Sequence, residues 1–309
     1  MTLLEPMQPS RRPRAATKIA SAVESASALD RVAEPLGGVA QRLAGTGARR
    51  SALSGTWLGH PLHPLIVGVP VGAWTSASVL DLLGQRRAAR TLIGVGLLAV
   101  APAAATGASE WADTTGAERR TGLVHMTANT VAALAYTRSW RLRRRGRDGR
   151  GVLWALVGAA AASAGGWLGG HLAYAIGVGV DTNAFSGGPQ EWTRLQGDLP
   201  EAGPPEGSAV QANAGGIPIL VVRSEGRIRA LADRCSHRGG PLSDGEIGDG
   251  CVTCPWHASR FDLATGEVVD GPAVAPQPTY EIRAADGGWE VRRHEERDLR
   301  VNPVGPLPA

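Results

Sequence analysis

The first 180 residues alternate between long uncharged windows and short charged segments. Four windows contain no Asp, Glu, Lys or Arg, and they cover residues 51–80, 91–109, 121–137 and 151–180. Runs of this kind are not typical of a soluble globule, and about 20 apolar residues are enough to cross a bilayer. The pattern therefore predicts an all-α transmembrane four-helix bundle over residues 51–180. Its third crossing is the shortest, and its last helix is expected to end near Gly169-Gly170.

A polar tail precedes this bundle at residues 1–50. Within it, apolar side chains recur at three- and four-residue steps over residues 18–36, which predicts an amphipathic helix that ends near Pro35. Such a helix is expected to lie on the membrane surface or on the bundle. Arg11 and Arg12 form a twin-arginine pair, but no apolar stretch follows before residue 51, so the pair does not indicate an export signal.

The pattern changes after residue 180. Residues 181–191 are rich in Gly, Pro and Ser, which predicts a flexible linker. Beyond it, short β-type runs separated by turn residues predict two hairpins, at residues 217–232 and 280–292. We therefore expect a compact, antiparallel all-β domain over residues 192–294, followed by a C-terminal tail at 295–309.

Charge and composition support this division. The hydrophobic content of 43% excludes wholesale disorder, and the net charge is +4. Nearly all basic residues are arginines, and they occur in short blocks between the uncharged windows. Membrane topology explains such blocks better than nucleic-acid binding does, so the lipid bilayer is an expected partner and a nucleic acid is not.

The arginine blocks also bear on orientation. The segments after the first and third windows hold ten arginines together, whereas the segment between the second and third windows holds two. The positive-inside rule then places the ten-arginine side in the cytoplasm and the β-domain outside a multi-pass cell-membrane protein. Arg42, Arg49 and Arg50 lie close to the first crossing and weaken this asymmetry, so the side of the β-domain stays open.

Candidate chemistry is concentrated in the β-domain. The chain has three cysteines within 20 residues, Cys235, Cys251 and Cys254, and an odd, clustered set indicates a metal site rather than a disulfide framework. Cys235 and His237 form a C-x-H motif, and Cys254 and His257 form a C-x-x-H motif sixteen residues later. Two ligand sets fit this spacing: a tetrahedral zinc site, or a [2Fe–2S] cluster with two cysteines on one iron and two histidines on the other.

The sequence around these motifs resembles a Rieske-type ferredoxin domain over residues 192–294. The likeness extends beyond the four candidate ligands to an ordered set of motifs. These are Ala230-Leu-Ala-Asp-Arg, Gly239-Gly-Pro-Leu, Cys254-Pro-Trp-His-x-Ser-x-Phe-Asp, Thr265-Gly-Glu and Gly271-Pro-Ala. The resemblance implies a [2Fe–2S] cluster held by Cys235, His237, Cys254 and His257.

The same resemblance implies roles for neighbouring residues. Gly239, Gly240 and the backbone near Ser259 would place N–H groups against the cluster sulfides, and Pro272 would belong to a loop that covers the cluster. Gly240 and Trp256 stand where quinol-oxidising Rieske proteins carry an extra disulfide, so the domain is similar to the ferredoxin subtype.

Three further observations concern the type of Rieske protein and the residues near its ligands. Ala258 stands where the family usually has Gly, which restricts the backbone beside His257. We interpret Cys251 as a buried strand cysteine. A Rieske oxygenase would need a second iron site in a large separate domain, and only His294 remains after His257, so we do not expect one.

Four further histidines belong to the predicted membrane domain: His60, His63, His125 and His171. Ionisable groups at membrane depth are costly, so we consider three hypotheses for them: a haem b or metal site, a quinone site, or interfacial histidines that bind loops and headgroups. The opening Gly59-His-Pro-Leu-His-Pro64 also resembles a family of predicted four-helix membrane proteins of unknown function over residues 55–180, which implies topology only.

Together these features predict a membrane-anchored Rieske electron-transfer protein without substrate chemistry of its own. Its expected partners are a membrane redox component and another protein, such as a reductase, an oxygenase or a cytochrome. Two alternatives stay open: an Fe–S redox sensor that acts through the bundle, and a quinol- or haem-linked oxidoreductase subunit.

Overall fold

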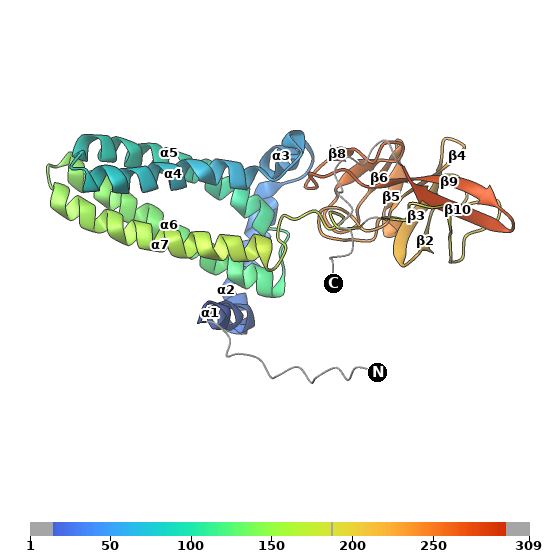
Figure 1. Ribbon diagram of the computed structural model, residues 1–309, viewed down its shortest axis with the longest axis horizontal. Coiled ribbons are helices and arrows are strands. Elements are labelled where there is room, and N and C mark those ends of the chain that lie inside the picture. The colour runs from blue at the N-terminus through green and yellow to red at the C-terminus, as the bar shows by residue number, and fades with distance from the viewer. Residues whose placement is uncertain (1–14, 187, 295–309) are drawn as a thin grey trace, which may run out of the picture. The chain divides into compact units, whose positions relative to one another are not determined.

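The computed structural model describes residues 15–186 and 188–294, in which a helical part precedes a β-part (Figure 1). The twin-arginine pair and the predicted tail at 295–309 lie outside the described residues. Within these residues, seven α-helices and two short 3-10 helices make up the helical part. They are α1 (Ala15–Ser25), η1 (Ser27–Leu29), α2 (Asp30–Ala44), α3 (Gly47–Ser54), η2 (Thr56–Leu58), α4 (Leu62–Leu82), α5 (Arg86–Trp111), α6 (Gly116–Arg144) and α7 (Asp148–Tyr174).

Helices α4 to α7 form over the four uncharged windows and share one core. Trp74 of α4 stacks on Tyr136 of α6 with ring centroids 4.2 Å apart, and Ile93 of α5 and Ala155 of α7 are buried in the same cluster. Gly96 makes room for the indole, because a Cβ atom there would lie 2.2 Å from Nε1 of Trp74. Four helices therefore pack on each other through side chains from every one of the predicted windows.

Helix α7 presents glycines to α6. A Cβ atom at Gly158 would lie 2.8 Å from the Tyr136 ring, and one at Gly165 would lie 2.6 Å from Asn129. At Gly151 it would lie 2.6 Å from Arg143. These missing side chains let two long helices approach closely, as small residues do in membrane helix pairs.

Within the described residues, three helices are long and apolar enough to cross a membrane: α4, α5 and α7. Helix α6 has 29 residues but carries Glu118, Arg119 and Arg120 near its start and ends in an arginine-rich turn. The helical character of the region and its apolar spans are thus as predicted, and the fourth crossing remains a prediction for α6.

The N-terminal amphipathic segment differs from the prediction. It is divided into α1 and α2, and α2 continues through Pro35 to Ala44, so the predicted end near Pro35 is wrong. Pro35 lies only five residues after the start of α2 and removes a single backbone bond there. Arg120 of α6 holds this segment, because it donates to both carboxylate oxygens of Asp30 at 2.7 Å.

The β-part contains two antiparallel sheets. The larger has the strand order β1-β10-β9-β4-β3-β2, and the smaller has the order β5-β6-β7-β8. The strands are β1 (Thr193–Arg194), β2 (Ala209–Ala214), β3 (Ile217–Ser224), β4 (Arg227–Ala232), β5 (Glu246–Gly248), β6 (Cys251–Thr253), β7 (Arg260–Asp262), β8 (Val268–Asp270), β9 (Thr279–Ala285) and β10 (Gly288–Arg293). A 3-10 turn, η3 (Leu242–Asp244), precedes β5. Both predicted hairpins are present, as β3–β4 and β9–β10.

The two sheets share a fully buried core. Leu220 and Leu231 of the larger sheet pack in one cluster with Val252 and Phe261 of the smaller sheet, and none of these four side chains is exposed. The same cluster contains the two cysteines of the predicted metal site. The core therefore fixes the loops that leave β4 and β6.

The chain divides into two compact units. The first consists of residues 15–40, 69–101 and 114–178, and the second consists of residues 41–68, 102–113 and 179–294. The second unit thus combines the β-domain with α3, η2 and the ends of two long helices. The candidate site lies entirely within this second unit.

Candidate metal centre

Two loops of the β-domain carry the candidate ligands, and they have the same backbone structure. The first connects β4 to η3, and the second connects β6 to β7. Each is closed by one hydrogen bond from the cysteine N–H and one to the cysteine carbonyl. These four bonds are Cys235 N to Gly240 O (2.9 Å), Gly239 N to Cys235 O (2.8 Å), Cys254 N to Ser259 O (2.8 Å) and Ala258 N to Cys254 O (3.0 Å). The N–H of Gly239 thus donates a hydrogen bond within its own loop.

Both loops need a left-handed residue four positions after the cysteine. Gly239 has a φ of 77°, and Ala258 has a φ of 59°. Glycine adopts this conformation freely, whereas an L-residue with a Cβ is strained there by about 1–2 kcal/mol. The departure from glycine noted at Ala258 therefore lies at a strained position beside His257.

The thiols of Cys235 and Cys254 are buried and hydrogen-bond to each other. This bond lowers the pKa of Cys254 to about 7 and raises the pKa of Cys235. Backbone N–H groups of His237 and Arg238 donate to the first sulfur, and those of Trp256 and His257 donate to the second. One thiolate is thus stabilised in this pair, as a metal ligand requires.

The two imidazoles lie beside each other. The ring centroids of His237 and His257 are 5.1 Å apart with an interplanar angle of 88°. Burial lowers the pKa of both rings, which keeps them neutral, and a neutral ring nitrogen is what binds iron. Nδ1 of His257 is buried without a hydrogen-bond partner, and such an orphaned acceptor or donor is rare in folded proteins.

The four predicted ligands are therefore arranged as a pair of thiols and a pair of imidazoles. Within the described ranges, no three His, Cys, Asp or Glu side chains are grouped around one point as a single metal ion would require. Cys251 has no part in the pairs. It begins β6 opposite Asp262 and is buried in the strand, as interpreted from the sequence.

Gly240 and Trp256 are neighbours in space. A Cβ atom at Gly240 would lie 2.9 Å from the indole of Trp256 and 3.0 Å from Sγ of Cys254. All three cysteines are free thiols, so the loops are joined here by packing rather than by a disulfide. Position 240 requires glycine because the Trp256 indole and the Cys254 sulfur occupy the space that a side chain would need.

Several residues that support the first loop were not recognised from the sequence. Gln277 is 2% exposed, accepts from Ser236 N at 3.0 Å, and donates to the carbonyl oxygens of Ala232 and Arg234. Ser236 also donates through its hydroxyl to Ala275 O at 2.7 Å. No sequence motif marks a glutamine of this kind, because its importance depends on three hydrogen bonds that only the folded chain brings together.

The predicted linker also contributes to the first loop. Thr182 donates through Oγ1 to Cys235 O at 2.8 Å, and Asn183 donates to Arg234 O at 2.7 Å. The start of the segment 181–191 is thus packed against the candidate site. Its Gly, Pro and Ser content predicted a flexible tether, and these contacts set a limit to that flexibility.

The loop that contains Pro272 lies against the second ligand loop. Ser259 is fully buried, and its Oγ accepts from Ala273 N at 3.0 Å. Pro272 is buried and follows a cis peptide bond from Gly271. The residues predicted to surround the site are therefore joined to the ligand loops by direct contacts.

The four histidines of the helical part have hydrogen-bond partners within the protein. Nδ1 of His63 lies 3.0 Å from Ala103 O, and Nδ1 of His125 lies 2.8 Å from Gly165 O. Nε2 of His171 lies 2.6 Å from Glu24 Oε1, and His60 contacts the adjacent Pro61 carbonyl. Such contacts are those of structural histidines, and nothing among the described residues supports a haem or a quinone at these positions.

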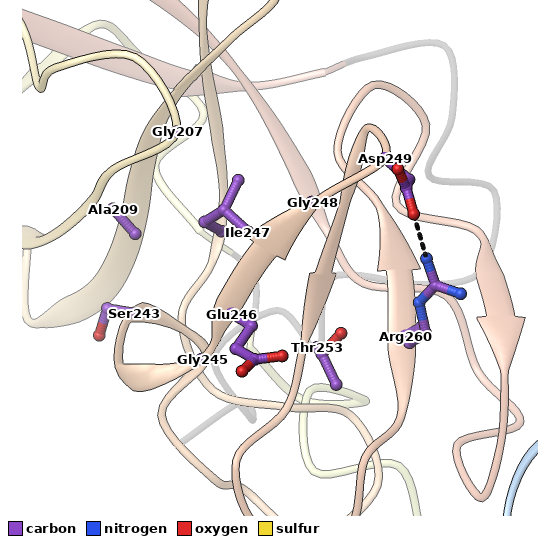
Figure 2. Close-up of a pocket in the computed structure, with 10 residues that line it drawn as sticks. All are labelled: Gly207, Ala209, Ser243, Gly245, Glu246, Ile247, Gly248, Asp249, Thr253 and Arg260. Carbon is purple, nitrogen blue, oxygen red and sulfur yellow. Dashed lines mark ion pairs between the residues drawn. The ribbon is translucent and has the colours of Figure 1, made fainter.

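One surface pocket lies elsewhere on the β-domain (Figure 2). It has a volume of about 680 Å³ and is lined mainly by polar and glycine residues of the smaller sheet, with Asp249 and Arg260 at an ion-pair distance of 4.0 Å. None of the predicted ligands lines it. The candidate centre is therefore the pair of loops rather than this pocket.

Comparison with known proteins identifies the family of the β-domain. Residues 197–281 match the family described as the Rieske [2Fe-2S] domain. The anthranilate 1,2-dioxygenase ferredoxin subunit of Burkholderia cepacia is 42% identical over 78 residues, which are 25% of this chain and 72% of that protein. The chain belongs to the Rieske ferredoxin family. The Rieske domain implies a [2Fe–2S] cluster, and its donor set of two thiols and two neutral imidazoles fits that group.

Other matches cover the same domain and the helical region. The 3-phenylpropionate/cinnamic acid dioxygenase ferredoxin subunit of Escherichia coli (strain K12) is 36% identical over 89 residues, 28% of this chain and 83% of that protein. The solved structure of the Sphingomonas yanoikuyae B1 ferredoxin aligns with 26% identity and a TM-score of 0.30, over 34% of this chain and 99% of that one. Residues 59–182 match a family described as predicted membrane protein (DUF2231). The chain thus joins a Rieske ferredoxin domain to a membrane-protein domain.

Proposed function

We propose that this chain is a membrane-anchored carrier that passes single electrons between a redox partner in the membrane and another protein. The observation that carries the proposal is the pairing of two buried thiols and two neutral imidazoles on the loops of a Rieske domain. This donor set suits a group that changes its charge by one electron with little rearrangement of the protein.

We assign Cys235 and Cys254 to one iron and His237 and His257 to the other. The orphaned Nδ1 of His257 supports this assignment, because an iron ligand there would satisfy a buried nitrogen that has no protein partner. Gly239, Gly240, Ser259 and Pro272 complete the surround through the loop contacts described above.

The cluster, when bound, supplies a one-electron couple whose potential is raised by the two neutral imidazoles. The chain's own residues set its surroundings. The buried core excludes water from both sulfurs, and four backbone N–H groups donate to them. Hydrogen bonds to ligand sulfur stabilise the more negative, reduced state and so raise the potential further.

We also propose that α4, α5, α6 and α7 all cross the membrane. Residues 41–68, 102–113 and 179–294 belong to one compact unit, so the start of α4, the end of α5 and the Rieske domain lie on one side. An even number of crossings must then separate the end of α5 from the Rieske domain. Because α7 is apolar enough to span, the even number requires that α6 spans as well.

The partners follow from the relatives' descriptions. Two of them are described as ferredoxin subunits of dioxygenases. For this chain we propose a reductase, an oxygenase or a cytochrome as the protein partner, with the bilayer domain holding the carrier near a membrane donor.

Electron counting in vesicles tests the proposal. The full-length protein, reconstituted in liposomes, is reduced with dithionite, and excess reductant is removed before it is mixed with oxidised cytochrome c. We expect one electron per chain to be transferred, and we expect the protein to stay with the liposomes in alkaline carbonate. Transfer of two electrons per chain, an absence of transfer, or release by carbonate would be incompatible with a membrane-anchored one-electron carrier.

A further inference from the structure

A buried ion pair of the helical region lies next to the candidate cluster ligands. Arg50 is in α3, and Asp113 follows α5, and both belong to the same compact unit as the Rieske domain. Their side chains are each 6% exposed, and Nη2 of Arg50 donates to Oδ2 of Asp113. Two charges are seldom buried without a reason, because their desolvation costs several kcal/mol per ion, roughly as much as their pairing returns.

The same carboxylate oxygen faces the imidazole of His237. Oδ2 of Asp113 lies 3.5 Å from Nε2 of His237, so the carboxylate is shared between a guanidinium and a ring nitrogen. A histidine that binds a metal through one nitrogen commonly donates the N–H of the other to a carboxylate, which fixes the tautomer and the ring orientation. With Nε2 directed at Asp113, Nδ1 is the nitrogen left for iron.

Two further contacts hold Arg50 in place. Ser51 accepts from Gly271 N at 2.9 Å, and Thr56 donates to Ala273 O at 2.9 Å. A Cβ atom at Gly271 would lie 2.3 Å from Thr56 Oγ1, which shows how closely η2 packs on this loop. The segment that carries Arg50 is thus fixed to the loop that contains Pro272.

Two opposite charges lie beside the candidate iron ligands. The carboxylate of Asp113 faces the His237 ring directly, and the guanidinium of Arg50 is paired with that carboxylate. Any group that acts on a charge at the imidazoles also acts on the charge of a cluster bound to them. The ion pair is therefore placed to alter the redox equilibrium of the cluster as well as the orientation of His237.

We propose that Asp113, held by Arg50, is a positioning residue that orients His237 and sets the reduction potential of the cluster, so that the helical region controls the redox centre directly. This inference rests on the ligand assignment proposed above. Neither residue lies in the Rieske sequence match, which begins at residue 197. A Rieske ferredoxin domain alone therefore lacks this control.

The two partners should move the potential in opposite directions. Reduction adds a negative charge, so a nearby carboxylate disfavours it and a nearby guanidinium favours it. Asp113→Asn keeps the shape but leaves the Arg50 cation unpaired, which should raise the potential. Arg50→Gln leaves the carboxylate unpaired, which should lower it. The double variant removes both charges and should lie between the two single variants.

The test is a redox titration of the full-length protein in detergent, followed by the EPR signal of the reduced cluster. We expect each single variant to change the reduction equilibrium by about tenfold, which is about 59 mV for a one-electron couple. We also expect altered nitrogen hyperfine couplings of the imidazoles in Asp113→Asn, with recovery in Asp113→Glu. The matched control is the ion pair of Arg283 and Glu290 on the β9–β10 hairpin, at 2.7 Å, whose neutral variants should leave the potential unchanged.

Different failures have different meanings. Potentials equal to wild type in all Asp113 and Arg50 variants with an intact cluster would overturn this inference and leave the proposed function standing. Shifts of the same sign in both single variants would also overturn it. Loss of the cluster in both single variants and in the double variant would identify the pair as a folding element only. A wild-type protein without a [2Fe–2S] signal would overturn the proposed function itself.

Discussion

Two cysteines only three positions apart have different surroundings. Cys254 lies in a ligand loop, hydrogen-bonded to Cys235 and to backbone N–H groups, whereas Cys251 lies in β6 opposite Asp262. Burial raises the pKa of Cys251, so its thiol stays protonated and is a poor ligand.

This difference predicts the outcome of a matched pair of substitutions. Cys254→Ser should abolish the visible absorbance of the cluster, because serine cannot supply the thiolate, and Cys251→Ser should retain it. Iron and acid-labile sulfide per chain are the measurement. An equal loss of iron and sulfide in the two variants would contradict the assignment of Cys254, and not Cys251, as the ligand.

Ala258 offers a second test at the residue scale. Its φ of 59° is strained for alanine, and glycine relieves this strain but adds about 0.4–1 kcal/mol of unfolded-state entropy. Ala258→Gly should therefore stabilise the loaded protein by about 0.5–1 kcal/mol, and Gly239→Ala should destabilise it by a similar amount. Denaturant unfolding followed by cluster absorbance measures both. A loss of stability in Ala258→Gly would mean that the strain is absent.

Gln277 shows how a single side chain fixes a ligand loop. Gln277→Ala removes the side-chain partner of the Ser236 N–H and of the Ala232 carbonyl, at about 1–3 kcal/mol for each group that stays buried, whereas the Arg234 carbonyl keeps its bond from Asn183. We expect a loss of about 3 kcal/mol in unfolding free energy, less any gain from water that enters. The exposed Gln196 is the control, and Gln196→Ala should change stability by less than about 0.5 kcal/mol. Equal changes in unfolding free energy for the two substitutions would show that the hydrogen bonds of Gln277 do not stabilise the ligand loop.

At the scale of elements, a buried ion pair joins α4 to α6. Arg143 has no exposed side-chain surface and binds both carboxylate oxygens of Asp81, at 2.7 and 2.5 Å. Arg86 contacts the same carboxylate at 3.2 Å. Two of the ten arginines that indicated the cytoplasmic side therefore also have a packing role, which a count of charges does not detect.

Breaking this pair should destabilise the helical unit. Arg143→Gln leaves Asp81 buried with only the half-exposed Arg86, and such a change costs about 3–5 kcal/mol. Arg141→Gln, at an exposed position on the same helix, should have little effect. Thermal unfolding followed by circular dichroism in detergent compares them. Similar melting temperatures for the two variants would show that the pair contributes little.

The elements that could be predicted from the sequence are those with a periodic pattern. The four uncharged windows became α4 to α7, and alternation with turn residues located both hairpins, because each pattern reports the surface that one element buries. Helices α3 and η2 could not be predicted in this way. Their positions depend on contacts such as Ser51 with Gly271, which are 220 residues apart in the chain.

The residues of the candidate site also fall into two groups, those that a sequence motif indicates and those that only the fold brings together. The four proposed ligands belong to the short motifs C-x-H and C-x-x-H, and the spacing of these motifs indicates a metal site. Arg50, Asp113 and Gln277 are ordinary polar residues in unremarkable sequence, and only the fold brings them to the ligand loops.

At the scale of the whole molecule, we expect the chain to cross the membrane four times. The turns at Gly84 and Gly146 should then face the side opposite to the Rieske domain, and their arginine content favours the cytoplasm for that side. Protease sites inserted at these turns, with a C-terminal tag for reference, can be compared in right-side-out and inside-out vesicles. Cleavage at Gly146 from the side that exposes the tag would rule out four crossings.

We propose that Cys235, His237, Cys254 and His257 together hold one [2Fe–2S] cluster. EPR of the dithionite-reduced, full-length protein, together with its metal content, tests it most directly. We expect two irons and two sulfides per chain and a signal with an average g value below that of the free electron, because antiferromagnetic coupling of one ferric and one ferrous iron leaves a net spin of one half. A colourless, EPR-silent protein that contains zinc would contradict it.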